Sequence, residues 1–263
     1  MADALFTRLD ADRVLPGPFA RGPWSPESLH GGPVAALLGG AAECLLEDLH
    51  PARATIELLR PVPVAPLRVA AALSRPGRKV RLVSTQVATE EGTVVATATV
   101  LGIRRADVAV PVSDDEESPP APDAVEAASR GSVSTAVDYD AFHNMGVEHR
   151  FVRGAFEHVG PATDWIRLRV PVVDGEPITP FQRVLAAADF GNGVSRLSDF
   201  ATTLFINPDL TVHLHRLPVG EWVCLDAVSR LEGHGVGLAQ SALWDEAGPL
   251  GRSLQSLLVE SRS

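Results

Sequence analysis

The chain of 263 residues repeats itself at a spacing of 156 positions. When residues 55–103 are laid over residues 211–259 without a gap, ten positions carry the same amino acid. Two of the matching pairs are glycines at expected turns, Gly77 with Gly233 and Gly92 with Gly248. Turns select glycine because it accepts a positive φ, and the spacing of turns sets the register of the strands between them. The match therefore indicates two copies of one structural module.

Each copy has the same order of elements, a helix followed by strands. In the first copy, residues 31–49 are rich in Ala and Leu, which predicts a buried helix. In the second copy, Thr179 caps and Pro180 opens a helix that continues from Phe181. Runs rich in Val, Thr and Leu predict strands of an antiparallel meander over residues 55–59, 67–73, 80–89, 93–103, 211–216, 222–229, 236–244 and 250–259. The second copy gains a leading hairpin over residues 151–159 and 165–172.

One long helix against an antiparallel sheet, made twice, is an α+β architecture. A strongly apolar helix needs cover on most of its surface, and a sheet curving around it provides that cover. Two such units are expected to pair their sheet edges into one continuous sheet, which removes exposed edges. Residues 113–122 are acidic and then proline-rich, so we expect units at 1–110 and 131–263 with a linker at 111–130.

Composition and charge exclude several classes of protein. The net charge of −10 disfavours attraction to nucleic acid or anionic lipid. No stretch approaches 18 uninterrupted apolar residues, so no membrane helix is expected, and the N-terminus lacks the basic segment of a secretory signal. Two cysteines, Cys44 and Cys224, can form neither a disulfide framework nor a four-cysteine metal site. We therefore expect a cytoplasmic protein that needs neither a metal nor another cofactor.

The duplicated helix-and-meander pattern resembles the double-hotdog acyl-CoA thioesterases, the type represented by bacterial thioesterase II. Four short motifs carry the resemblance: Leu29-His30-Gly31-Gly32-Pro33-Val34, Ala186-Ala187-Ala188-Asp189, Thr211-Val212-His213-Leu214-His215-Arg216 and Ser253-Leu254-Gln255. It spans nearly the whole chain except the linker. It implies a double hotdog fold, hydrolysis of an acyl-CoA or related thioester in fatty acid metabolism, and, because the sheets of this fold commonly pair, a homodimer.

The resemblance also implies site residues. In that family an Asp, a Thr and a Gln orient the water that attacks the thioester. The Asp falls on Asp189 and the Gln on Gln255, whereas the Thr falls on Asn207, which departs from the pattern because Asn has no hydroxyl. Thr211, four residues further on, is a second candidate for contact with the substrate.

The residues themselves agree with a single site. Under the 156-residue offset, Asp189, Asn207 and Gln255 lie over positions 33, 51 and 99, which hold two prolines and a threonine, so only the second copy carries the polar set. Asp189 follows a run of alanines in an apolar helix, and burying its carboxylate there costs several kcal/mol unless the group is paired. Asp189 is therefore a candidate general base, or else a structurally paired acid.

A glycine pair at the start of the first helix and a basic turn complete the prediction. Gly31 and Gly32 open the first helix and are candidates to line the thioester carbonyl with backbone N–H groups, or else a simple tight turn. The turn at 75–81 holds four basic residues, which would suit the phosphates of CoA or a solvated hairpin tip.

Three functions remain open at this point. A thioesterase is favoured. The sequence contains no Gly-x-Ser-x-Gly elbow, which argues against a serine hydrolase of the α/β type. The Asn207 departure favours a non-catalytic acyl-CoA or acyl-ligand binding protein of the same fold. A structural partner in a larger assembly is the third reading.

Overall fold

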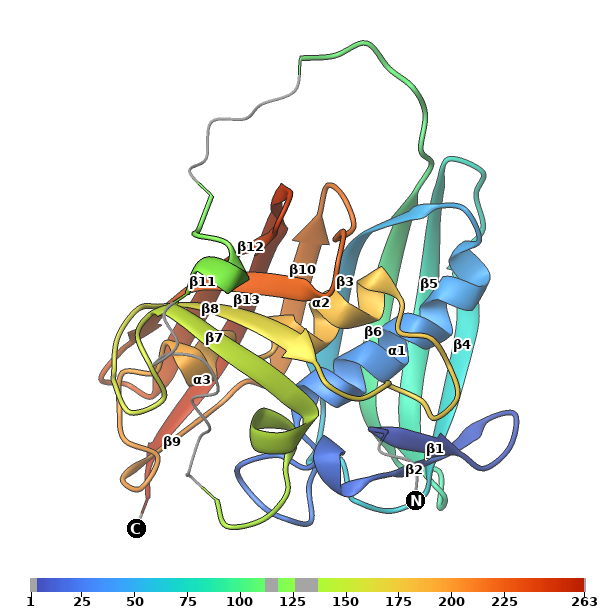
Figure 1. Cartoon of the computed structure of the whole chain (residues 1–263). Helices are drawn as coiled ribbons and strands as arrows, with labels where there is room; N and C mark the ends of the chain where they lie inside the picture. The colour runs from blue at the N-terminus through green and yellow to red at the C-terminus, as the bar shows by residue number, and fades with distance from the viewer. Residues whose placement is uncertain (1–3, 112–117, 126–136, 263) are drawn as a thin grey trace.

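One antiparallel sheet of 13 strands runs through the computed structural model, which describes residues 4–111, 118–125 and 137–262 (Figure 1). Its strands follow the order β1-β2-β4-β5-β6-β3-β10-β13-β12-β11-β8-β7, and β9 pairs with β13 outside that path. The first half supplies β1 (Phe6–Arg8), β2 (Arg13–Pro16), β3 (His50–Leu58), β4 (Leu67–Arg75), β5 (Val80–Thr89) and β6 (Val94–Ile103). The second half supplies β7 (Val147–Arg153), β8 (Ala162–Leu168), β9 (Thr203–Ile206), β10 (Asp209–Leu214), β11 (Trp222–Leu231), β12 (Val236–Asp245) and β13 (Gly248–Ser261).

The repeat in the sequence is also a repeat in space. Adding 156 to the bounds of β5 gives the bounds of β12. The two halves meet where β3 pairs with β10, and at this junction Thr55 lies directly opposite its repeat partner Thr211. Two copies that meet at equivalent residues of antiparallel strands are related by a pseudo-two-fold axis. The predicted α+β double hotdog, with one continuous sheet, is therefore confirmed.

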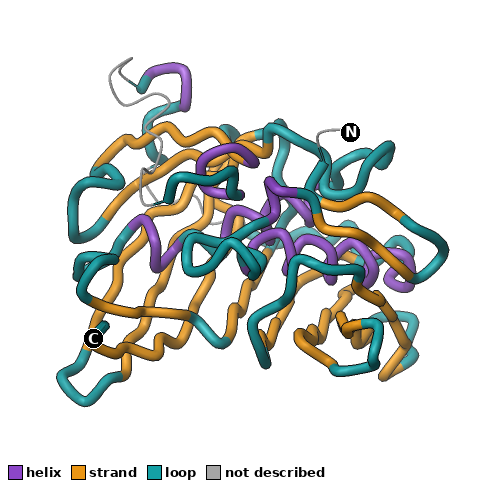
Figure 2. Tube along the Cα trace, turned by 90° about the horizontal axis from the view of Figure 1, so that it is seen from below, coloured by secondary structure: helices purple, strands orange, loops and turns teal. Residues whose placement is uncertain are grey.

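The helices lie in the hollow of the curved sheet (Figure 2). The first, α1 (Gly31–Leu46), ends three residues earlier than predicted. It packs closely on α2 (Pro180–Ala188), because a Cβ at Gly39 would collide with a methyl carbon of Leu185. Glycine at this position lets the two helices approach each other.

The second helix is shorter than predicted. Thr179 and Gln182 form the expected capping box and Pro180 occupies the first turn, but α2 ends at Ala188, and a separate turn, α3 (Gly191–Val194), follows. Asp189 is therefore the residue that ends the helix, whereas the sequence predicts it inside the helix. This position leaves its carboxylate free of the helix interior and close to neighbouring elements.

The register of β13 against β12 differs by one residue from that of β6 against β5 in the first half. In the first half the turn between β5 and β6 takes three residues, since the N–H of Thr89 donates to the carbonyl of Thr93. In the second half Asp245 pairs with Gly248, which leaves a two-residue turn. A slip of one residue turns every side chain of a strand to the other face. Gln255 consequently faces the core, whereas Thr99, its partner in the gapless repeat, is only partly buried.

Some elements differ from the prediction or were missed. The strands β1, β2 and β9 are too short to give a clear pattern, and the leading hairpin lies earlier, at β7 and β8. Residues 112–117, with their acidic run, and residues 126–130 of the predicted linker lie outside the described residues. The described part at 118–125 is not simply exposed, because Pro122 is buried and the indole N–H of Trp165 donates to the carbonyl of Pro120 at 2.8 Å. None of the helices in the described ranges combines the length and apolar character that a membrane crossing requires.

Candidate active site

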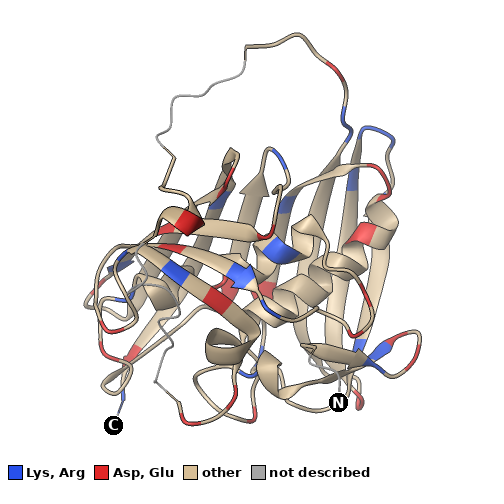
Figure 3. Ribbon diagram, in the orientation of Figure 1, with Lys and Arg blue, Asp and Glu red and all other residues tan. Residues whose placement is uncertain are grey.

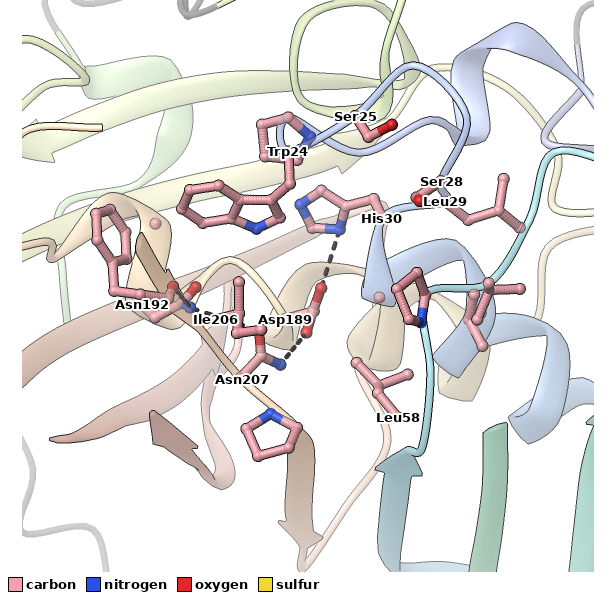
Figure 4. A pocket seen from close by; sticks show the side chains of 18 of the residues that line it. Trp24, Ser25, Ser28, Leu29, His30, Leu58, Asp189, Asn192, Ile206 and Asn207 are labelled. Atoms are coloured by element: carbon pink, nitrogen blue, oxygen red, sulfur yellow. Dashed lines mark hydrogen bonds and ion pairs between the residues drawn. The ribbon is translucent and has the colours of Figure 1, made fainter. Parts of the chain in front are cut away.

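A cavity of about 500 Å³ opens where the two halves of the chain meet (Figure 4). Its lining comes from residues 23–34 and 58–62 of the first half and from 189–193 and 200–208 of the second. The rings of Trp24, Phe200 and Phe205 form one apolar wall, with centroids 4.8–5.3 Å apart. A polar end holds His30, Asp189 and Asn207. A deep apolar pocket with a few convergent polar groups is the usual form of a small-molecule site.

Asp189 is the centre of the polar end. Its side chain is only 4% exposed and it receives three side-chain donors. The Oδ1 atom accepts from the amide of Asn207 at 2.8 Å and from that of Gln255 at 3.3 Å. The Oδ2 atom lies 2.9 Å from Nδ1 of His30. The cost of burying the carboxylate is thus met by hydrogen bonds from both halves of the chain.

His30 is the site residue that sequence reasoning missed. Its Nδ1 lies 2.9 Å from Asp189 and 3.1 Å from the backbone nitrogen of Gly32, and one nitrogen cannot donate to the first and accept from the second. A carboxylate only accepts, so the proton belongs on Nδ1 and the contact with Asp189 is the hydrogen bond. The signal was present, since His30 precedes the two glycines of the first motif. Its partner, however, lies 159 positions further along the chain.

The structure brings the three predicted polar residues together, but in two layers. Asp189 and Asn207 border the cavity, whereas Gln255 is 1% exposed and lies behind them. The Nε2 of Gln255 donates to the backbone carbonyl of Asp189 at 3.1 Å, and its Oε1 accepts from the N–H of Asn192 at 3.0 Å. Gln255 therefore fixes the backbone after α2 and does not itself border the cavity.

The two glycines at the start of α1 differ in their surroundings. Gly31 lines the cavity, and a Cβ there would stand 2.7 and 2.9 Å from the oxygens of Asp189. The absence of a side chain thus allows the carboxylate to reach the helix start. Gly32 packs against the carbonyl of Ala186 and the ring of Phe142, and it is not among the residues that border the cavity. The prediction that Gly32 lines the substrate carbonyl does not fit this placement.

Two further predictions do not fit the cavity. Thr211 lies opposite Leu254 on β13, whose neighbour Gln255 faces inward, so the alternation of the strand puts Thr211 on the outer face of the sheet. The basic turn at 75–81 joins β4 to β5 (Figure 3), and Arg81 there contacts Leu45 and Glu47 at the far end of α1. That end is about 24 Å from the helix start, as 16 residues rise 1.5 Å each.

Comparison with known proteins identifies the family to which this chain belongs. The model of the acyl-CoA thioesterase N-terminal domain matches residues 20–102, and that of the C-terminal domain matches residues 114–259. The chain therefore belongs to the acyl-CoA thioesterase family. A search of curated protein sequences gives no match.

Solved structures share the fold over nearly their full length. A proposed thioesterase of Novosphingobium aromaticivorans superposes with a TM-score of 0.72 at 20% identity, over 98% of this chain and 99% of that one. A hot dog fold protein of unknown function from Alicyclobacillus acidocaldarius gives 0.71 at 20% identity, over 97% and 95%. The acyl-CoA thioesterase II TesB2 of Mycobacterium marinum gives 0.66 at 16% identity, over 98% and 95%. At these identities the likeness establishes the fold alone.

Proposed function

We propose that this chain hydrolyses the thioester of an acyl-CoA, with Asp189 as the group that takes a proton from the attacking water. The observation that supports the proposal is the carboxylate at the junction of the two halves. It borders an apolar cavity and receives hydrogen bonds from His30 of the first half and Asn207 of the second. Membership of the acyl-CoA thioesterase family supports the same substrate class.

The hydrogen bonds to Asp189 leave room for a water. An ionised carboxylate offers about four lone-pair sites. Donors from Asn207, Gln255 and His30 take three of them. The remaining site can accept an O–H of a water, which then lies at the cavity wall where the acyl group binds. Because donors from several elements fix the carboxylate, little reorganisation is needed when the water reacts.

In the proposed reaction the water oxygen attacks the thioester carbonyl carbon while one of its protons passes to Asp189. The N–H of Gly31, at the positive end of α1, faces the developing oxyanion. Collapse of the tetrahedral intermediate breaks the carbon–sulfur bond, and the proton on Asp189 passes to the leaving thiolate. The products are the free acid and CoA. Gln255 acts as a positioning residue, and Asn207, at the position of the family Thr, donates to Asp189.

The experiment that tests the proposal compares Asp189→Asn with the parent protein on a series of acyl-CoAs. The amide keeps the shape of the side chain and cannot accept a proton, so we expect kcat to fall by about a hundredfold or more. Calorimetry with the same acyl-CoA should still detect binding. Asp226→Asn, which alters an acid on β11 that pairs with Arg153, is the matched control and should leave kcat unchanged. An Asp189→Asn protein as fast as the parent would disprove the assignment.

The second candidate is a binding protein of the same fold that does not turn its ligand over. The presence of Asn207 where the family has Thr is the observation that favours it. Calorimetric binding of an acyl-CoA by the parent protein, with no hydrolysis over hours, would establish this function in place of the first. The homodimer, the cytoplasmic location and the unit boundaries at 110 and 131 stay predictions.

A further inference from the structure

A buried, hydrogen-bonded histidine–aspartate pair that the proposed reaction does not use lies behind the candidate site. His149 on β7 and Asp164 on β8 are 2% and 0% exposed, and Nδ1 of the histidine lies 2.6 Å from Oδ2 of the acid. Burial raises the pKa of Asp164, and the contact with His149 only partly offsets this. Apolar residues of similar volume usually stabilise a protein core at least as well as a buried pair of this kind. The fold alone therefore does not explain the presence of this pair.

The pair is connected to the candidate site through one aromatic ring. Phe190, the residue after Asp189, borders the cavity. Its ring also makes a T-shaped contact with the imidazole of His149, with ring centroids 4.9 Å apart and planes at 84°. The same ring lies 4.8 Å from that of His30, whose Nδ1 contacts Asp189. A single ring thus touches both imidazoles. A displacement of His149 is transmitted to His30 by contact alone.

Phe142 is the third ring against Phe190, and two more titratable groups, His143 and Cys224, lie near the pair. Phe142 stacks on Phe190 at 5.4 Å and completes an apolar cage. Of the titratable neighbours, His143 stays uncharged near neutrality because burial, with His30 and His149, lowers its pKa to about 3. Cys224 stays protonated because burial, with Asp164 and Asp226 adding to the effect, raises its pKa well above the usual value.

We propose that His149 and Asp164 are positioning residues for the candidate site, holding Phe190 and through it the imidazole of His30 in line with Asp189. The inference rests on the proposed function and adds two residues that touch neither substrate nor cavity. It gives a reason for a buried pair in place of apolar packing, because the hydrogen bond at Nδ1 fixes the tilt of the His149 ring. Phe190 can then take one orientation only.

The test uses two variants and a matched control. Asp164→Asn replaces the carboxylate that contacts His149 and keeps the shape of the side chain. The double variant His149→Leu with Asp164→Val replaces the pair by apolar side chains, so we expect it to fold even where the single change is destabilising. The control is Asp245→Asn, which removes an acid from the Arg216–Asp245 pair, also at 2.6 Å, at the end of β12.

Two measurements are made on each protein. The first is kcat and KM for the best acyl-CoA substrate of the parent, where we expect kcat to fall roughly tenfold in both variants and KM to stay within about twofold. The second is the imidazole NMR signal of His30, assigned by its loss in His30→Gln, which should shift or broaden in both. Asp245→Asn should move neither. The NMR measurement does not depend on turnover, so a parent protein without hydrolysis would refute the proposed function and leave this inference open to its own test.

The outcome that overturns the inference is a folded double variant with the melting temperature of the parent, an unchanged kcat and an unchanged His30 signal. In that case the pair only fills the core. A fall in kcat together with a large rise in KM would also contradict the inference, because it would indicate a general loosening of the cavity.

Discussion

Acid should destabilise the folded protein through His143. This histidine is 4% exposed, in the π-helical turn at Phe142–Gly146, and neither ring nitrogen has a hydrogen-bond partner among the described residues. Burial, with contributions from His30 and His149, lowers its pKa from 6.5 to about 3. Between these values the unfolded chain binds a proton that the folded chain does not. Proton binding therefore favours the unfolded state as the pH falls below about 6.5.

The size of the effect follows from the shift. Each pH unit below 6.5 costs about 1.4 kcal/mol of unfolding free energy, so this one residue removes about 2 kcal/mol at pH 5 and almost nothing at pH 7. His143→Leu removes the titration and, since no partner is left behind, should not by itself disrupt hydrogen bonds. When the pH falls from 7 to 5, the free energy of unfolding of the variant should consequently rise by about 2 kcal/mol relative to that of the parent.

Urea unfolding followed by circular dichroism at pH 7, 6 and 5 measures this difference. Other titrating groups are common to both proteins and cancel in the comparison. His158→Leu, which replaces an exposed histidine, is the control for the loss of a histidine side chain as such. A stability gap between the parent and His143→Leu that is the same at pH 7 and pH 5 would refute the reasoning from burial.

Two further predictions concern the site. Gly31→Ala puts a methyl group 2.7 Å from Asp189 Oδ2, so the carboxylate must move. We expect kcat in a thioesterase assay to fall about tenfold or more. An unchanged kcat would contradict the proposed geometry. Asn207→Asp keeps the shape but replaces the donor to Asp189 by a second carboxylate, whereas Asn207→Thr keeps a donor. The Asp variant should therefore have the lower kcat of the two at pH 7. Equal kcat values would count against a donor role for Asn207.

The sequence by itself determined the architecture. The repeat at 156 residues and the order of apolar runs are properties of local periodicity, and they correctly predicted two modules and a continuous sheet. The caps of α2 were also readable, because Thr179 and Pro180 act on the residues next to them. Signals of this kind depend on neighbours in the chain and survive without knowledge of the fold.

The tertiary structure alone decided which side chains meet. A turn shorter by one residue reversed the face of β13, so Gln255 points inward although its repeat partner Thr99 does not. His30 became part of the candidate site only because α1 begins beside the end of α2, where Asp189 lies. Register and helix docking are set by contacts between residues far apart in the chain, and such contacts leave no periodic trace in the sequence.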